Sequence, residues 1–352
     1  MRALTLAAIL LLLSRDRQTR ELPRYREPFV YTQKDWNLAD WPDVNCRAFC
    51  RFNKAELSEL ADLLDIGAIT FSNRLRPSPE LALAITLNRL HYPATWRSRC
   101  EIFGRSIGYL STVFTEVILH LDTTYAALLD WHPRLDDEQL LEYFAQHVEA
   151  IHELKGIWGF IDGTFRGFRR PGIDQQRWYS GHYKMHGFKY QGVVTPDGIL
   201  SSLSGPWRGP VSDWKGFLDS IVVQKARRMN RRRRQRGTRL YLYGDAAYGL
   251  QHAGILGPHK RQALGCLTPS QQIFNRKCSR MRISIEHAFG HVQRQFTYTD
   301  FHQGLSLGLQ PVASFYRVSA LFANLLTCYR GNQTSQTFDC NPPTVYEYLQ
   351  IE

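Results

Sequence analysis

Residues 157–164 read IWGFIDGT, a short apolar run that ends at the carboxylate of Asp162. A run of this length, coming after helical patterns, predicts a buried strand. Residues 240–243 predict a second strand, and Asp245 follows it within the segment YGDAAY. A carboxylate at the carboxyl end of a strand lies where open α/β sheets bind ligands. A single Asp at the end of a strand would be interpreted as a turn cap. Because two strands are each followed by an Asp, the sequence indicates a ligand-binding site.

Further strands and helices surround these two segments. Residues 188–195 and 199–203 predict a hairpin, because Pro196, Asp197 and Gly198 between them favour a turn. A brief strand is expected at residues 264–267, and helices at residues 213–228, 281–296 and 314–328. Strands that alternate with helices in this way predict an α/β domain with a mixed sheet over residues 151–330.

A third carboxylate, Glu286, lies within the predicted helix 281–296. An apolar stripe on this helix has the spacing i, i+4, i+7, i+11 and must face the sheet: Ile285, Phe289, Val292 and Phe296. Glu286 is about 100° from Ile285 around the helix, at the border of that face. An exposed pair with Arg282, four residues earlier, is one interpretation. The other is a carboxylate that reaches over the edge of the stripe toward the strand ends.

Three carboxylates at one site repel each other unless cations hold them together. Hard oxygen ligands select Mg²⁺ or Mn²⁺, which also keep waters and bind phosphate. Two such ions can activate a water or a 3′-hydroxyl and stabilise the leaving oxygen of a phosphoryl displacement. If Asp162, Asp245 and Glu286 converge, the sequence therefore predicts metal-dependent chemistry at phosphodiester bonds, with two divalent ions.

Helical patterns dominate residues 46–150. Asn53 is a predicted N-cap, with Glu56 as its capping-box partner. Further helices are expected at residues 80–90, as a pair over 96–129, and at 136–154. The pair, with Gly104 in its turn, has the pattern of a helix-turn-helix that could enter a DNA major groove. A plain αα-hairpin is the alternative, since few Arg, Asn or Gln side chains are available for base edges.

The two ends of the chain carry weaker signals. Residues 1–14 (MRALTLAAILLLLS) superficially resemble a signal peptide, but no small-x-small cleavage site follows and the run is too short to span a bilayer. We expect a buried leading helix there, and a secreted protein is the alternative. Prolines among aromatic and charged residues predict an extended arm at residues 23–45, which completes an N-terminal segment 1–45. Residues 331–352 are expected to form a C-terminal tail.

The composition favours a folded protein with an anionic partner. The chain has 352 residues, with 44 Lys and Arg against 32 Asp and Glu, a formal net charge of +12. Such a charge favours nucleic acid first and an anionic membrane second, although a basic surface can also serve solubility alone.

The seven cysteines lack metal-site spacing, so we expect reduced thiols, most of them buried. His182 and His186 stand four apart, but no HExxH motif accompanies them, which argues against zinc.

Residues 225–239 (KARRMNRRRRQRGTR) hold nine basic residues and no acidic one. Such a run could follow a DNA backbone or act as a nuclear address, and a solvated helix end is the alternative. We expect DNA contacts from Lys184, Lys189 and six arginines of this run: Arg227, Arg228, Arg231, Arg232, Arg233 and Arg234. Trp178 and Trp207 are expected to pack at the rim of the core, and a stacking role against an extruded base is the alternative.

Six motifs in order resemble Harbinger-type DDE transposases and their domesticated nuclease relatives. They are DGT (162–164), YxGHYK (179–184), VVTPDG (193–198), GPxSDW (209–214), GDAAY (244–248) and RISIEHAFGHVQRQF (282–296). The resemblance covers about residues 155–300 and implies an RNase H-like fold. It also implies that Asp162, Asp245 and Glu286 are the catalytic, metal-binding triad. Asp213 matches a further acidic position, either an accessory ligand or a structural hydrogen-bond acceptor.

The sequence thus predicts a metal-dependent DNA endonuclease or transposase in the nucleus, with a helical domain at residues 46–150 before the catalytic domain. The resemblance implies double-stranded DNA as the substrate and, in many members, a separate Myb-like DNA-binding partner. No membrane partner is expected, and the sequence leaves a homo-oligomer open. The alternative is a domesticated DNA-binding or scaffold protein that keeps the fold without catalysis.

Overall fold

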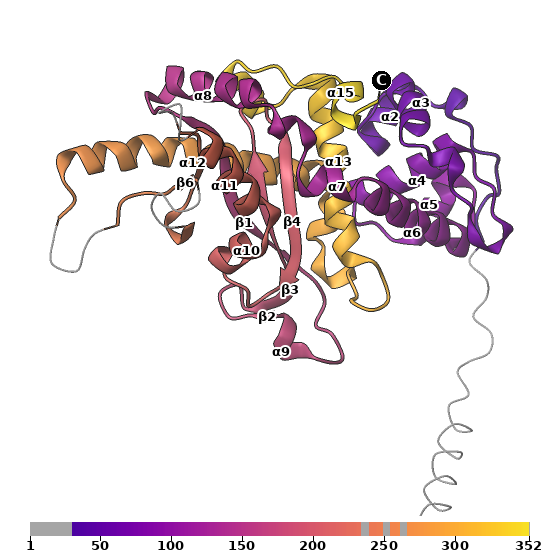
Figure 1. The fold of residues 1–352 in the computed structure, drawn as a ribbon. Coiled ribbons are helices and arrows are strands. Elements are labelled where there is room, and N and C mark those ends of the chain that lie inside the picture. Colours follow the sequence, from indigo (N-terminus) through magenta and orange to yellow (C-terminus); the bar gives the residue numbers. More distant parts are fainter. Residues whose placement is uncertain (1–29, 234–238, 249–253, 261–265, 352) are drawn as a thin grey trace, which may run out of the picture.

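The computed structural model describes residues 30–233, 239–248, 254–260 and 266–351. Within these ranges a mixed sheet is flanked by helices, and a further group of helices lies beside it (Figure 1). The predicted α/β arrangement is therefore confirmed. The expected leading helix at residues 1–14 lies outside the described residues, as do residues 234–238 of the basic segment.

The sheet combines antiparallel and parallel pairs in the order β4-β3-β1-β5-β6, with the short β2 also on β3. Its strands are β1 (Ile157–Gly167), β2 (Tyr179–Ser180), β3 (Met185–Val194), β4 (Leu200–Arg208), β5 (Tyr241–Gly244) and β6 (Ile255–Leu256). β3 runs antiparallel to β1, β2 and β4, whereas β5 runs parallel to β1 and β6. The predicted hairpin is confirmed, and Gly198 adopts φ +83° in its turn.

Two strand predictions are corrected. The strand that carries Asp162 does not end there, because β1 continues to Gly167. Pairing with β3 extends as far as Gly167 opposite Gly187, so β1 stays extended after its parallel partner β5 has ended at Gly244. The strand expected at residues 264–267 falls partly outside the described residues, and its last two residues are irregular. The two-residue strand β6 was not predicted.

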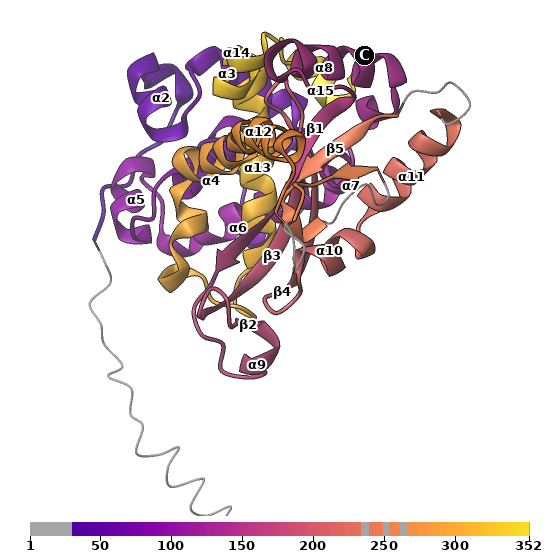
Figure 2. The ribbon, with the colours of Figure 1, turned by 90° about the vertical axis from the view of Figure 1, so that its left-hand side faces the viewer.

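Helices cover both faces of the sheet. Figure 2 shows α12 (Pro269–Gln295) and α13 (Val312–Arg330) on one side, and α10 (Asp213–Asp219) and α11 (Ile221–Arg233) on the other. The single helix predicted at residues 213–228 is wrong: Ser220 is extended, and its hydroxyl donates to the Phe217 carbonyl oxygen at 2.7 Å, which separates α10 from α11. The apolar stripe of α12 is buried as predicted, but the helix begins earlier, at a capping box of Thr268 and Gln271.

Helices also fill the N-terminal part of the described chain. They are α2 (Asp43–Cys50), α3 (Lys54–Leu63), α4 (Pro79–His91), α5 (Trp96–Phe103), α6 (Ile107–Thr124), α7 (Ala126–Asp130) and α8 (Glu138–His152). The capping box of Asn53 and Glu56 is confirmed, and the pair expected over residues 96–129 is three helices. α5 and α6 are separated by Gly104, which adopts φ +63° at the C-cap of α5, and meet at 95°. No single described helix is long and apolar enough to cross a membrane, although α5 and α6 together pass that test.

The C-terminal residues 331–351 pack on the rest of the fold through α14 (Gln333–Phe338) and α15 (Val345–Leu349). Phe338 stacks on Phe160 of β1 with ring centroids 5.5 Å apart, and Tyr348 accepts a hydrogen bond from Asn324 of α13. All seven cysteines are free, and five of them are buried, in line with the prediction. The buried hydrophobic residues form one cluster that reaches from Trp36 to Leu349.

His132 supplies a pH dependence that follows from this core. Its ring is fully buried and lies between the Tyr348 carbonyl oxygen and the backbone N–H of Arg134. Burial, followed by the charge of Arg134, lowers the pKa of His132 from 6.5 to about 4. Between these two pH values the His132 ring is protonated in the unfolded chain but stays neutral in the folded protein. Stability is therefore retained above about pH 6.5 and lost as the pH falls toward 4.

We expect the wild-type protein to lose about 2 kcal/mol more unfolding free energy between pH 7.5 and 5.0 than the His132→Gln variant. The measurement is urea denaturation of both proteins at the two pH values. Other titrating groups are present in both, so they cancel in the comparison. Parallel losses in the two proteins would show that His132 titrates in the folded state much as it does in the unfolded chain.

Candidate active site

Asp162 and Asp245 follow residues that pair directly across two parallel strands. Ile161 of β1 stands opposite Gly244 of β5; Asp162 is the next residue of β1, and Asp245 is the first residue after β5. The Asp162 carboxylate accepts a hydrogen bond from the Gly163 N–H at 2.8 Å, and the Asp245 carboxylate accepts one from the Ala247 N–H at 2.8 Å. Local backbone donors thus orient both carboxylates at the point where the parallel pairing ends.

Asp162 faces the side of the sheet that α12 covers. It is paired with Gly192 of β3, and directly opposed residues point to the same face. A Cβ on Gly192 would stand 2.7 Å from the ring of Phe289 of α12, so this face lies under the apolar stripe of that helix. Glu286 is exposed and lies three residues before Phe289, one turn nearer the start of α12. The helix therefore carries Glu286 over the same face as Asp162.

Asp213 lies on the opposite face. Gly163 follows Asp162 and points away from it, and a Cβ on Gly163 would collide with the Asp213 carboxylate. The side chain of Asp213 pairs with Lys189 of β3 at 2.9 Å, and only 12% of the Lys189 side chain and 29% of that of Asp213 are exposed. This geometry fits the structural role that the sequence analysis allowed for Asp213. It also explains why a glycine follows Asp162.

A buried tyrosine connects the segment that carries Asp245 to β3. Tyr248 packs against Gly244, and its hydroxyl accepts a hydrogen bond from Gln191 of β3 at 2.9 Å. Burial raises the pKa of Tyr248 well above 10, and the negative charges of Asp213, Asp162 and Asp245 raise it further. Burial and three nearby carboxylates therefore keep this hydroxyl neutral. Tyr248 lies in the GDAAY motif but was not among the predicted site residues.

The carboxylates suit a hard divalent cation by their chemistry, since oxygen ligands of this kind bind Mg²⁺ or Mn²⁺. Their arrangement supports this only in part. In the ranges that the structure describes, no group of three or more His, Cys, Asp or Glu side chains is close enough to hold a metal ion. The structure brings Asp162 and Asp245 to neighbouring strand positions, and it leaves Glu286 on the helix above them.

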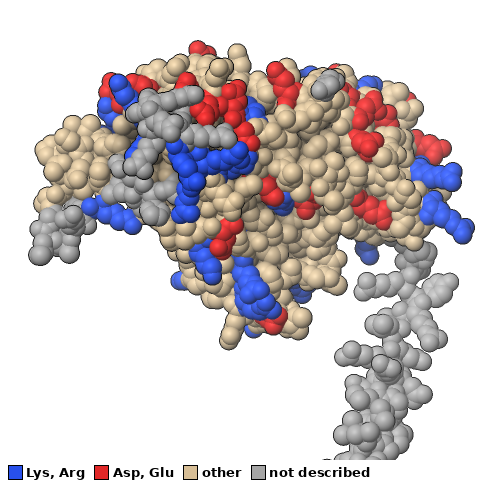
Figure 3. All heavy atoms as spheres, in the orientation of Figure 1, with Lys and Arg blue, Asp and Glu red and all other residues tan. Residues whose placement is uncertain are grey.

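The predicted nucleic-acid residues fall into two groups. Lys184 is exposed in the turn between β2 and β3, whereas Lys189 is engaged with Asp213. On α11 the exposed arginines are Arg227, Arg228 and Arg231, while the side chains of Arg232 and Arg233 and all of Arg234 lie outside the described residues. Figure 3 shows Lys and Arg side chains gathered over this helix. α11 therefore presents a basic outer face.

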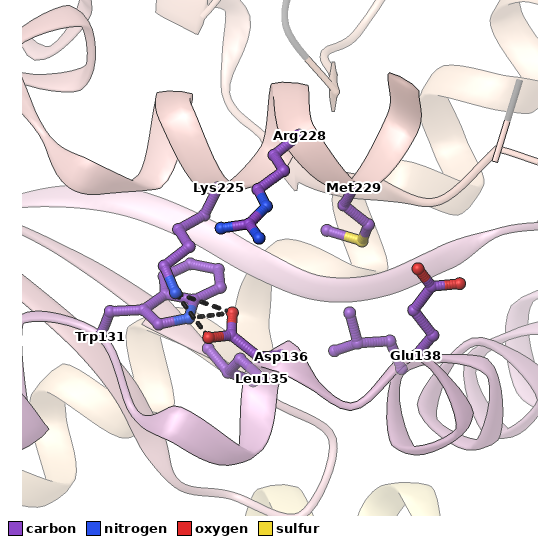
Figure 4. Close-up of a pocket in the computed structure, with 8 residues that line it drawn as sticks. Trp131, Leu135, Asp136, Glu138, Lys225, Arg228 and Met229 are labelled. Carbon is purple, nitrogen blue, oxygen red and sulfur yellow. Dashed lines mark hydrogen bonds and ion pairs between the residues drawn. The ribbon is translucent and has the colours of Figure 1, made fainter. Parts of the chain in front are cut away.

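The inner side of α11 is anchored to the helical region through Lys225. Its ammonium pairs with Asp136 at 2.6 Å and lies 5.6 Å from the ring of Trp131, whose indole N–H donates to the same carboxylate (Figure 4). The aliphatic side chain of Met229 is buried one turn further on. Lys225 is thus committed to a structural contact, and Arg228, although exposed, lines the pocket beside it.

Comparison with known proteins gives one family match. Residues 161–324 match the family model described as DDE superfamily endonuclease, and the match includes Asp162, Asp245 and Glu286. No curated protein and no solved structure matches the chain. The mixed sheet flanked by helices is consistent with a DDE nuclease fold. The match indicates a transposase or nuclease function for this part of the chain.

Proposed function

We propose that the protein is a DDE endonuclease or transposase of the Harbinger type that cuts DNA with divalent metal ions. The observation that carries this proposal is the position of Asp162 and Asp245, next to a directly paired Ile161 and Gly244 within the segment that matches DDE endonucleases. Glu286 is the proposed third ligand, and this is supported by its position on α12, the helix that covers the face to which Asp162 points.

An RNase H-like fold is part of this proposal. Three antiparallel strands (β4, β3, β1) continue into two parallel ones (β5, β6), with helices on both faces. In this arrangement β1 supplies the first aspartate, the end of β5 the second, and a helix the glutamate. The order of the three residues along the chain follows the order of these elements.

The chemistry is divided between ions and protein. Bound Mg²⁺ or Mn²⁺ would activate a water or 3′-hydroxyl and neutralise charge on the phosphate and the leaving oxygen. The protein orients the carboxylates of Asp162 and Asp245 by the backbone N–H groups of Gly163 and Ala247. The exposed arginines of α11 bind the DNA backbone in this proposal, and the same basic segment directs the protein to the nucleus. A Myb-like partner would supply sequence reading.

A DNA-binding scaffold without catalysis is the second candidate. It is favoured by one observation: within the described part of the chain, no three metal-binding side chains are close enough to hold an ion. The basic outer face of α11 would serve such a protein equally well. The two candidates differ in whether bound DNA is cut.

Incubation of the purified protein with labelled supercoiled and linear duplex DNA separates them. With Mn²⁺ or Mg²⁺ we expect nicking at a rate at least about a hundredfold above that in EDTA, since metal ions supply several kcal/mol of transition-state stabilisation. A gel-shift assay with the same DNA reports binding independently. Binding without nicking in either metal would support the scaffold, and nicking that persists in EDTA would contradict metal dependence.

A further inference from the structure

The motif YSGHYK at residues 179–184 has no part in the proposed chemistry, and the structure gives it a distinct shape. Tyr179 and Ser180 form β2, and the chain turns back into β3 through Tyr183 and Lys184. The ring of Tyr183 stacks on that of Phe165 of β1, with centroids 4.4 Å apart and an angle of 11° between the planes. Tyr183 remains 41% exposed, so this stacked pair lies at the surface.

The stacked pair lies further along the strand that carries Asp162, on the other face of the sheet. Phe165 follows Asp162 by three residues on β1, about 10 Å along a strand, and because side chains alternate it points to the face on which Asp213 lies. It also stands opposite Lys189, which pairs with Asp213. Burial raises the pKa of Tyr183, and the charges of Asp213 and Asp162 raise it further, so its hydroxyl lies within the field of both carboxylates.

The surroundings of the pair are basic. Residues 166–189 contain six Lys and Arg against one Asp. Lys184 is exposed next to Tyr183, and Arg169 and Arg170 are exposed in the loop that follows β1. Figure 3 shows Lys and Arg side chains at the lower tip of the molecule, where Figure 1 places α9 (Gln175–Trp178) and β2. An anionic ligand is therefore favoured here over a neutral or cationic one.

Exposed aromatic rings within a basic surface are the means by which proteins hold unpaired bases, because every base has a face that can stack. We propose that Phe165 and Tyr183 form a stacking platform for an unpaired DNA base, on the face of the sheet opposite to Asp162. That this base belongs to the DNA cut at Asp162 and Asp245 rests on the proposed function, whereas the binding of an unpaired base does not.

The test measures binding rather than cutting, in EDTA, with duplexes that carry one unpaired 2-aminopurine at successive positions of a short overhang or gap. We expect quenching of the probe on binding to the wild-type protein. The Tyr183→Ala variant should lose quenching and bind about tenfold or more weakly, while Tyr183→Phe should stay within about twofold of the wild-type protein. Tyr143→Ala, at an exposed tyrosine of α8, is the matched control and should bind normally.

A substrate with an abasic site at the quenched position separates stacking from folding. On it, the wild-type protein and Tyr183→Ala should bind equally, because no base remains to stack. Equal weakening of Tyr183→Ala on abasic and fully paired DNA would overturn the proposal by showing a structural role, as would normal quenching in that variant. Failure of the proposed nuclease function would appear separately, as intact DNA in Mn²⁺ with the quenching unchanged.

Discussion

Replacement of Asp162 by Asn should lower metal-dependent DNA cleavage about a thousandfold, equivalent to about 4 kcal/mol of transition-state stabilisation. The amide keeps the size of the side chain and can still accept the hydrogen bond from the Gly163 N–H. It removes the charge that a divalent ion requires of its ligand. The fold should therefore persist while activity is lost, and Asp245→Asn should behave in the same way.

The comparison needs two further variants, each assayed for cleavage rate, metal concentration dependence and DNA binding. Asp219→Asn changes an exposed aspartate at the end of α10 and should cut normally. Asp213→Asn should retain more activity than Asp162→Asn, because Asp213 lies on the other face of β1 and pairs with Lys189. Cleavage by Asp162→Asn at the wild-type rate would remove Asp162 from the active site.

The site could be predicted in part because its signals are local. Asp162 and Asp245 each follow an apolar run, and a sheet brings such positions together wherever the strands are neighbours. The apolar stripe of α12 likewise follows from spacing alone. The continuation of β1 beyond Asp162 could not be read in this way. Asp162, Gly163 and Thr164 look like a strand end, and only pairing with β3 keeps them extended.

The contacts behind the aspartates also depend on the tertiary fold. Gly163 is required because Asp213, fifty residues later, places its carboxylate against it from the opposite face. Tyr248 contacts Gln191 only in the folded sheet, in which β1 lies between β3 and β5. No local sequence pattern predicts these two contacts. The same holds for the joining of the N-terminal helices and the sheet in one hydrophobic cluster, which includes residues of α13.

Arg317 of α13 is the polar centre of that junction. It is 7% exposed, its Nε donates to Asp122 of α6 at 2.7 Å, and its Nη1 donates to Asp130 of α7 at 3.0 Å. The guanidinium also donates to the carbonyl oxygens of Leu203 in β4 and Ala126 in α7. Burial disfavours its charge, but the hydrogen bonds and charges of the two aspartates outweigh this and raise its pKa. One side chain thus ties two helices and a strand to α13.

Arg317→Met should cost about 3–5 kcal/mol of unfolding free energy, because it removes one partner of a buried ion pair and leaves buried carbonyl groups without a donor. The lower end of this range is expected, since Asp130 is half exposed and water can reach it. Arg317→Lys should be intermediate, as an ammonium keeps the charge but not the fork of donors. Urea denaturation measures all three proteins, with the exposed Arg227→Met as a control that should change by less than about 0.5 kcal/mol. A loss below about 1 kcal/mol in Arg317→Met would mean that the helices and the sheet are held together by apolar packing alone.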